Sequence, residues 1–237
     1  MKKSVFLIII SFCLLNNYIK AQGPTTIDQS FRPVFAAGLC GSQIDGDNYS
    51  GYKHIAYFLG VGINRQLSRR FEVEFMLTLL QKGVRSNYKT DSASLNNPNN
   101  PFTLIRLDYL EIPICFKINY KRFKAEAGGA FGYLIKNPPY DRTQLGPVTP
   151  TYPFNTFDYS FLLGAGYKLS PTVFINVRFE YSLVPAQPFP AVSGGVWRGI
   201  LGGLFNKGGY NNCLMLTLNY RLPSKPSTTV PPPVNEQ

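Results

Sequence analysis

Polar and apolar side chains alternate along this chain in about eight runs, and the segments between the runs alternate short and long. In the clearest run, residues 213–222, every even position is large and apolar, while the odd positions include Thr217, Asn219 and Arg221. A β-strand points successive side chains to opposite faces, so each run predicts a strand with one apolar and one more polar face. Because a lipid-spanning segment must satisfy its own backbone hydrogen bonds, only a helix or a closed barrel can cross a bilayer.

The connections between the runs fall into two length classes. We expect strands at residues 32–41, 54–67, 71–86, 103–119, 122–136, 156–169, 172–184 and 210–222. The tight connections are 68–70, 120–121 and 170–171, and the long ones are 42–53, 87–102, 137–155 and 185–209. Short periplasmic turns that alternate with long outer loops are typical of outer-membrane barrels. The pattern therefore predicts an all-β fold, an eight-stranded antiparallel up-and-down transmembrane β-barrel.

The two rows of side chains on these strands differ in size as well as polarity. One row is bulky, as in the odd positions of 55–63 and the even positions of 110–118, whereas the other mixes charge with glycine. The interior of an eight-stranded barrel is only wide enough for side chains, so glycines beside long residues are useful there. On an outer face glycine would weaken a strand. We expect the charged row to face the lumen and the bulky row to face lipid; a soluble ligand-holding barrel is the alternative.

Charged side chains in the lumen must be paired, because a buried unpaired charge is very costly. The sequence therefore predicts an interior ion-pair network. Its expected members are Glu72, Glu74, Glu111, Lys117, Lys124, Glu126, Asp158, Lys168, Arg178, Glu180 and Arg221. The alternative is an acid–base array along a conducting path, for which eight strands leave little room.

The N-terminal residues have the pattern of a secretory signal peptide, with Lys2 and Lys3 before an apolar stretch and Ala21 at the cleavage site. The apolar stretch is too short for the roughly 20 residues of a transmembrane helix. We expect a signal peptide at 1–21, a periplasmic lead at 22–30, an outer-membrane barrel at 31–222 and a Pro-rich disordered periplasmic tail at 223–237. The expected location is the cell outer membrane.

The charge content and the distribution of basic residues limit which classes of partner we expect. Charged residues make up 16% of the chain, against about 25% in soluble domains. The formal net charge is +11, but the basic residues are scattered and lack the clustering of a nucleic-acid site. We therefore expect no nucleic acid. The expected partners are outer-membrane lipid and a protein of the envelope or of a secretion system.

Three segments of the sequence resemble segments of a known protein family. They are Leu-Gln-Lys-Gly at 80–83, Leu-Asp-Tyr-Leu-Glu-Ile-Pro at 107–113 and Gly-Gly-Ala-Phe-Gly-Tyr at 128–133. Their order resembles the PorT-like outer-membrane β-barrel family over about residues 31–222. The resemblance implies an eight-stranded outer-membrane barrel without a catalytic motif. The family's namesake belongs to the type IX secretion apparatus.

Catalytic and metal-binding patterns are weak. His54 is the single histidine, and Asp45, Asp47 and Ser50 are its candidate partners at the outer rim. Nothing in the sequence fixes the hydrogen-bond geometry that a nucleophile and its base require. The turn at 45–48 lacks the glutamate that completes a calcium loop. We expect no enzyme activity, no cofactor and no metal.

Three other features lead to specific expectations. Cys40 and Cys213 take the inward parity on the first and last strands, so a disulfide could lock the barrel seam if they lie directly opposite. Pro113 has no N–H to donate, so we expect a bulge there. Trp197 and Arg198, in the last long connection, are candidates for contact with a partner.

These observations favour a non-enzymatic outer-membrane barrel with a structural or docking role in the envelope, linked to type IX secretion by the resemblance. A small porin or transporter is the second hypothesis. An enzyme that modifies lipid with the rim histidine is the third.

Overall fold

The computed structural model describes residues 30–46, 51–85, 103–136, 140–142, 146–148, 152–188 and 207–223. The regular secondary structure of these residues consists of β-strands. The long strands are β1 Phe31–Asp45, β2 His54–Gln66, β3 Phe71–Arg85, β4 Thr103–Tyr120, β5 Phe123–Lys136, β8 Phe157–Lys168, β9 Val173–Ser182 and β11 Gly208–Arg221. Short strands lie in two of the outer connections, β6 Tyr140–Arg142, β7 Gly146–Val148 and β10 Gln187–Pro188. Every predicted strand is present.

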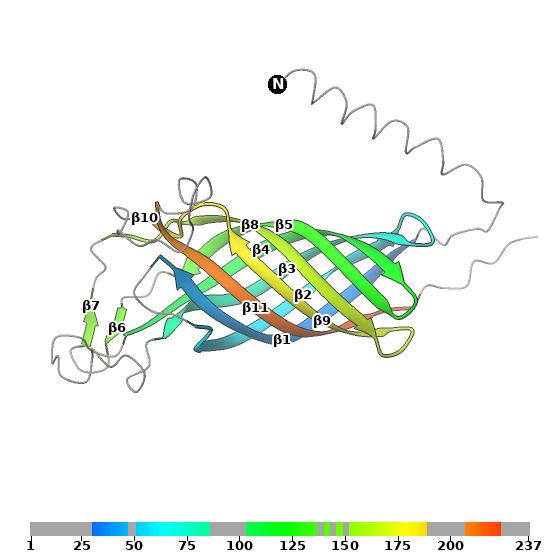
Figure 1. Cartoon of the computed structure of the whole chain (residues 1–237), viewed down its shortest axis with the longest axis horizontal. Helices are drawn as coiled ribbons and strands as arrows, with labels where there is room; N and C mark the ends of the chain where they lie inside the picture. The colour runs from blue at the N-terminus through cyan, green and yellow to red at the C-terminus, as the bar shows by residue number, and fades with distance from the viewer. Residues whose placement is uncertain are drawn as a thin grey trace, which may run out of the picture.

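The long strands close into a barrel. Their order is β3-β2-β1-β11-β9-β8-β5-β4, and β3 also pairs with β4 (Figure 1). The seam between β1 and β11 is antiparallel and runs from the pair Val34–Arg221 to the pair Asp45–Tyr210. The predicted eight-stranded up-and-down barrel is confirmed. No helix among the described residues is long and apolar enough to cross a membrane.

Several predicted segments lie outside the described residues. They are the signal peptide at 1–21, nearly all of the lead at 22–30 and nearly all of the tail at 223–237. Their assignments stay predictions.

Two tight turns at one end of the barrel are fixed by serine side chains. In the β2–β3 turn, Ser68 Oγ accepts a hydrogen bond from the backbone N–H of Phe71 at 3.1 Å. In the β8–β9 turn, Ser170 Oγ accepts one from Val173 at 3.0 Å. A serine that caps its own turn in this way favours a short reversal. The end with the short turns is the periplasmic end, as in other outer-membrane barrels.

The alternation in the sequence sets which side chains face outward. On β2, Ile55 is 70% exposed, whereas Phe58 is 2% exposed. The bulky row lies on the outer wall and the charged and glycine-rich row faces the lumen, as predicted. Inward glycines lie opposite long side chains: Gly132 pairs with Glu111, and Gly164 pairs with Glu126. A Cβ at either glycine would meet that glutamate, so glycine makes the room that the ion pairs occupy.

Apolar side chains also fill much of the lumen, which the sequence pattern did not predict. One cluster lies inside β11, β1, β2 and β3 and consists of Val34, Ala36, Cys40, Phe58, Met76, Leu80, Cys213 and Met215. A second cluster, which we call the outer cap, lies at the outer ends of the strands and consists of Ile44, Val84, Ile105, Leu107, Tyr109, Leu134 and Phe154. The outer cap therefore places buried apolar side chains in the outer end of the lumen.

The bulge predicted at Pro113 is wrong. The register between β3 and β4 is the same on both sides of this residue, so the chain has no extra residue there. The hydrogen-bond pairing between β3 and β4 is interrupted near Pro113 without a change of register, because proline has no N–H to donate. The register shift of β4 lies instead between Asp108 and Tyr109, where β4 pairs with β5.

Candidate functional site

Lys82 is the centre of an ionic cluster in the outer half of the lumen. Its side chain is completely buried, and its Nζ lies 2.7 Å from Glu111, 3.0 Å from Asp158 and 2.5 Å from Glu180. The four residues come from β3, β4, β8 and β9. The Lys82 ammonium also lies 5.1 Å from the ring centroid of Tyr109, a cation–π contact that adds to the ion pairs. We call these four charged residues the Lys82 cluster.

Neutral donors add hydrogen bonds to two of the carboxylates in the Lys82 cluster, Asp158 and Glu180. Ser182 Oγ and Asn211 Nδ2 each donate to Asp158 Oδ2 at 2.9 Å. Ser160 Oγ donates to Glu180 Oε1 at 2.9 Å. Buried carboxylates are tolerated when donors surround them in this way. The cluster therefore acts as a polar plug below the apolar outer cap.

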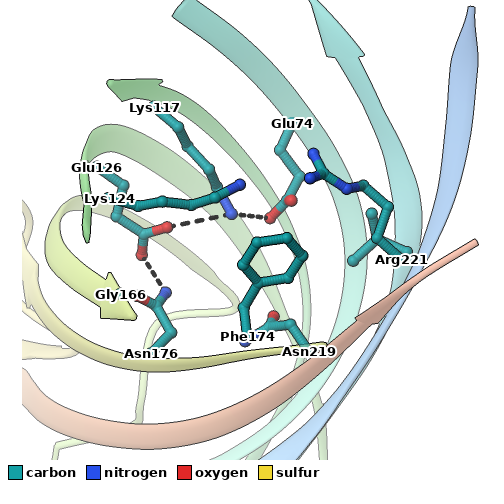
Figure 2. Close-up of a pocket in the computed structure, with 10 residues that line it drawn as sticks. Glu74, Lys117, Lys124, Glu126, Gly166, Phe174, Asn176, Asn219 and Arg221 are labelled. Carbon is teal, nitrogen blue, oxygen red and sulfur yellow. Dashed lines mark hydrogen bonds and ion pairs between the residues drawn. The ribbon is translucent and has the colours of Figure 1, made fainter. Parts of the chain in front are cut away.

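A second ionic cluster lies in the periplasmic half of the lumen. Arg178 donates to both carboxylate oxygens of Glu126, at 2.6 and 3.2 Å, and Asn176 Nδ2 donates to Glu126 Oε1 at 2.8 Å. Lys117 Nζ bridges Glu74 at 2.6 Å and Glu126 at 3.3 Å. Figure 2 shows Lys117 between the two glutamates. These contacts join β3, β4, β5 and β9.

Glu72 anchors the bases closest to the periplasmic end. It accepts from Lys124 Nζ at 2.9 Å and from Arg221 Nη1 at 3.0 Å, and Arg221 Nη1 also lies 3.1 Å from Asn64 Oδ1. Both cations lie over the ring of Phe174, at 4.0 Å for Lys124 and 4.7 Å for Arg221. Figure 2 shows this ring among the charged side chains. Arg221 is the last residue of β11, so the contact ties the end of the barrel sequence to β3.

The pocket in this half of the lumen is small. It is lined by Val34, Glu74, Lys117, Lys124, Glu126, Gly166, Phe174, Asn176, Asn219 and Arg221. Its volume is about 20 Å³, which is room for a water molecule rather than for a solute. Within the described residues, no group of three or more His, Cys, Asp or Glu side chains could hold a metal ion.

The predicted ionic residues thus lie in two clusters rather than one network. All of them make ion pairs except Lys168, which is half-buried at the end of β8 and makes none with the described residues. Among the described residues Lys82 makes the most ion pairs, and it is not one of the predicted members. Its even position on β3 matches Glu72 and Glu74, so the strand parity could have identified it as inward-facing.

The two seam cysteines are free thiols in the structure and are not directly opposite each other. Cys40 pairs with Met215, and Cys213 pairs with Ser42, which is an offset of two residues. Both are fully buried in the same apolar cluster. The register that the disulfide required is therefore absent.

Of the partners proposed for His54, the structure describes only Asp45, and the carboxylate of Asp45 is engaged elsewhere. The histidine is buried, and its Nε2 has no hydrogen-bond partner in the part of the chain that the structure describes. Asp45 instead accepts from Asn212 at 2.9 Å and from Gln43 at 2.5 Å. Tyr52 donates to Asn212 Oδ1 at 2.7 Å, and burial raises the pKa of the Tyr52 phenol. These contacts hold the first outer connection against the β1–β11 seam.

Four candidate residues lie outside the described residues. They are Asp47 and Ser50 near His54, and the partner-contact candidates Trp197 and Arg198.

The closed barrel, its outward apolar wall and its charged interior define a small outer-membrane β-barrel protein. The chain belongs to the family described as "Outer membrane protein beta-barrel domain", whose model matches residues 21–186. This places the protein in the cell outer membrane. A search of the curated proteins found no match to the sequence.

Solved structures of small outer-membrane proteins are similar to this chain at low identity. Neisserial surface protein A is 12% identical with a TM-score of 0.46, and the aligned region covers 81% of this chain and 97% of that protein. Ail, the attachment invasion locus protein of Yersinia pestis, has 10% identity and a TM-score of 0.43, with 81% and 99% covered. OprG from Pseudomonas aeruginosa has 10% identity and a TM-score of 0.41, with 83% and 98% covered.

Proposed function

We propose that this protein is a non-enzymatic outer-membrane barrel with a structural or docking role in the envelope, and that it acts through its rims and outer connections. The observation that carries the proposal is the filled lumen. Lys82 and its three carboxylates occupy the outer half, and the apolar outer cap lies above them. A protein whose interior is packed in this way presents its functional surfaces outside the lumen.

The same packing argues against a small porin or transporter. A pore requires a continuous water-filled path, whereas the described part of the lumen contains ion pairs, the two apolar clusters above and a third, smaller one of Cys115, Ala130 and Leu162. The periplasmic pocket is about 20 Å³ in volume, too small for a hydrated solute.

The rim geometry argues against a lipid-modifying enzyme. A general base needs its nucleophile within hydrogen-bond reach. Asp45, a candidate partner of His54, has its carboxylate engaged by Asn212 and Gln43 instead. We therefore assign His54 no catalytic role.

The PorT-like resemblance gives the docking role a specific form. It is narrower than the domain family to which the chain belongs. It suggests a protein of the type IX secretion apparatus as the partner. Trp197 and Arg198 are our candidates for the contact, because a tryptophan beside an arginine is typical of residues that dominate binding energy.

Two measurements test this proposal. Planar-bilayer recordings of the purified mature barrel are expected to show no unitary currents; regular single-channel steps would overturn the non-conducting role. Affinity purification from detergent-solubilised outer membranes is expected to retain one partner in near-stoichiometric amount. The W197A/R198A variant is expected to lose that partner while keeping the heat-modifiable gel migration of a folded barrel. A solitary wild-type monomer in these extracts would contradict a docking role.

A further inference from the structure

The carboxyl groups of the Lys82 cluster outnumber its cation. Lys82 carries one positive charge, whereas its three partners from β4, β8 and β9 would carry three negative charges if all were ionised. The side chains of the cluster are at most 4% exposed, so water does not screen the surplus. An uncompensated charge in such a dry site is very costly, and a buried acid avoids that cost by keeping its proton.

The described strands around the cluster supply no second cation. β5 presents Gly132 opposite Glu111. Ser42 of β1 and Asn211 of β11, which lie at the same level of the lumen, are uncharged. The titratable and charged groups that surround Glu111 are Lys82, Tyr109, Asp158, Glu180 and the thiols of Cys40 and Cys213. Among these, Lys82 alone carries a positive charge.

Glu111 has the fewest hydrogen-bond donors of the three carboxyl groups. Asp158 and Glu180 together accept three hydrogen bonds from serine and asparagine side chains. No neutral donor among the described residues reaches Glu111. Its Oε1 lies 2.7 Å from Lys82 Nζ but without the geometry of a hydrogen bond. An ionised carboxylate can only accept hydrogen bonds, so the ionised form is least stabilised at Glu111.

A proton on Glu111 leaves the other two carboxylates well compensated. Glu111 and Glu180 contact the same nitrogen, so the two carboxyl groups are close neighbours. Carboxyl groups that share a site hold a proton, because two adjacent negative charges repel each other. With Glu111 neutral, the remaining negative charge is spread over Asp158 and Glu180, which accept five hydrogen bonds including two from Lys82.

Glu111 lies in the part of β4 that is least regularly paired. On its periplasmic side the pairing with β3 is interrupted at residues 112–113, and on its outer side the register with β5 shifts between Asp108 and Tyr109. The outer cap takes three of its residues from the outer end of β4, beyond Glu111. A new charge on Glu111 would therefore act on a weakly held stretch of backbone that leads directly to the outer cap.

We propose that Glu111 is a neutral carboxylic acid in the folded barrel at neutral pH, and that loss of its proton in alkaline medium loosens the outer cap. In this step the O–H bond of Glu111 breaks and the proton passes to hydroxide, which becomes water. Three carboxylates then face the single ammonium of Lys82. The Lys82 cluster is thus a pH-sensitive latch between the wall of the barrel and its outer end.

The test compares the wild type with E111Q, whose amide has the shape of the neutral acid but no proton to lose. E74Q, in the periplasmic cluster, is the matched control. Each mature barrel is folded in detergent micelles, and infrared spectra at neutral pH are searched for the C=O band of a protonated carboxylic acid. Denaturant titrations from about pH 6 to pH 9 then give the unfolding equilibrium constant, whose pH dependence reports proton uptake. Hydrogen exchange compares segment 103–111 with segment 71–77, corrected for the intrinsic rate at each pH.

The wild type and E74Q are expected to show the carboxylic acid band, and E111Q is expected to lack it. In the wild type the band should disappear reversibly at alkaline pH. Because an unfolded glutamate has a pKa of about 4.3, the unfolded chain has already released this proton. Stability should therefore fall as the pH rises, and the unfolding constant of the wild type should increase relative to E111Q by up to about tenfold per pH unit while the folded barrel keeps the proton.

Hydrogen exchange tests the link to the outer cap. Protection of segment 103–111 should fall at alkaline pH in the wild type but not in E111Q, while segment 71–77 stays protected in both. A wild type without the infrared band, a band that persists in E111Q, or equal pH dependence of unfolding in the two would overturn the neutral state of Glu111. Equal protection of segment 103–111 in the two at alkaline pH would overturn the latch. These readouts need no docking partner, so they are independent of the proposed function.

Discussion

The ammonium nitrogen of Lys82 lies 3.0 Å from Asp158 Oδ2, although 76 residues separate the two in the chain. Lys82 belongs to β3 and Asp158 to β8, and these strands are not neighbours in the barrel wall. The ion pair therefore spans the lumen and joins opposite parts of the wall. Because Glu111 and Glu180 contact the same ammonium, one lysine links four strands at one level of the barrel.

Replacing Lys82 with methionine is expected to destabilise the barrel strongly. The substitution keeps much of the volume but leaves three buried carboxylates without their cation. Removing one partner of a buried ion pair costs about 3–5 kcal/mol. The free energy of unfolding, measured by denaturant titration in detergent micelles, should fall by an amount of this size.

Lys168→Met is the matched control for this prediction. Lys168 is half-buried and makes no ion pair with the described residues, so its loss should change the free energy of unfolding by no more than about 0.5 kcal/mol. A double-mutant cycle with Glu180→Gln should show coupling to Lys82, because the two groups are in direct contact. Equal effects of the two lysine substitutions would contradict the role of the Lys82 cluster.

Gly164→Val is expected to disturb the periplasmic ionic cluster. A Cβ at Gly164 would lie against the carboxylate and Cγ of Glu126, which pairs with Arg178. Overpacking of this kind costs about 1–3 kcal/mol. The same unfolding titration should show a loss in this range. Ala165→Val, one position along on the exposed outer face, should show none; an equal loss for both would mean that Gly164 does not face the lumen.

Cys40, Cys115 and Cys213 are expected to be free thiols in the folded protein. Diagonal neighbours in an antiparallel sheet are about 7–8 Å apart, beyond the usual Cα separation of a disulfide, and Cys40 and Cys213 are offset by two residues. All three thiols are buried. A polar alkylating reagent should leave the intact barrel unmodified and modify all three after heat unfolding without reductant. Modification of two of them only after reduction would show that the seam is cross-linked.

The sequence pattern predicted the wall of this barrel well because strand parity is a strict geometric rule. Ile55 and Phe116 lie outside and Glu111 lies inside, as their positions in the alternating runs require. The tight turns were also predictable, since Ser68 and Ser170 stand where a short reversal needs a side-chain acceptor. Local spacing alone determines both features.

The contents of the lumen were less predictable, because they depend on which strands face each other across it. Met76 and Met215 share the inward parity with the charged residues, yet they pack in an apolar cluster. The offset of Cys40 from Cys213 depends on the register of the seam, and single-strand patterns do not fix the register between the first and last strands. The bulge lies at Asp108 rather than Pro113, since a missing N–H interrupts a ladder without adding a residue.

The central claim is that the bulky outward row contacts acyl chains. Leu216, midway along β11, is 51% exposed on this face. The direct test places a single tryptophan there, as L216W in a W197F background, and compares its fluorescence in vesicles of ordinary and of brominated phosphatidylcholine, with K121W in the same background as the control. We predict strong quenching of the tryptophan at position 216 by brominated chains and little at position 121. An unquenched tryptophan at position 216 in the folded, reconstituted barrel would contradict the account.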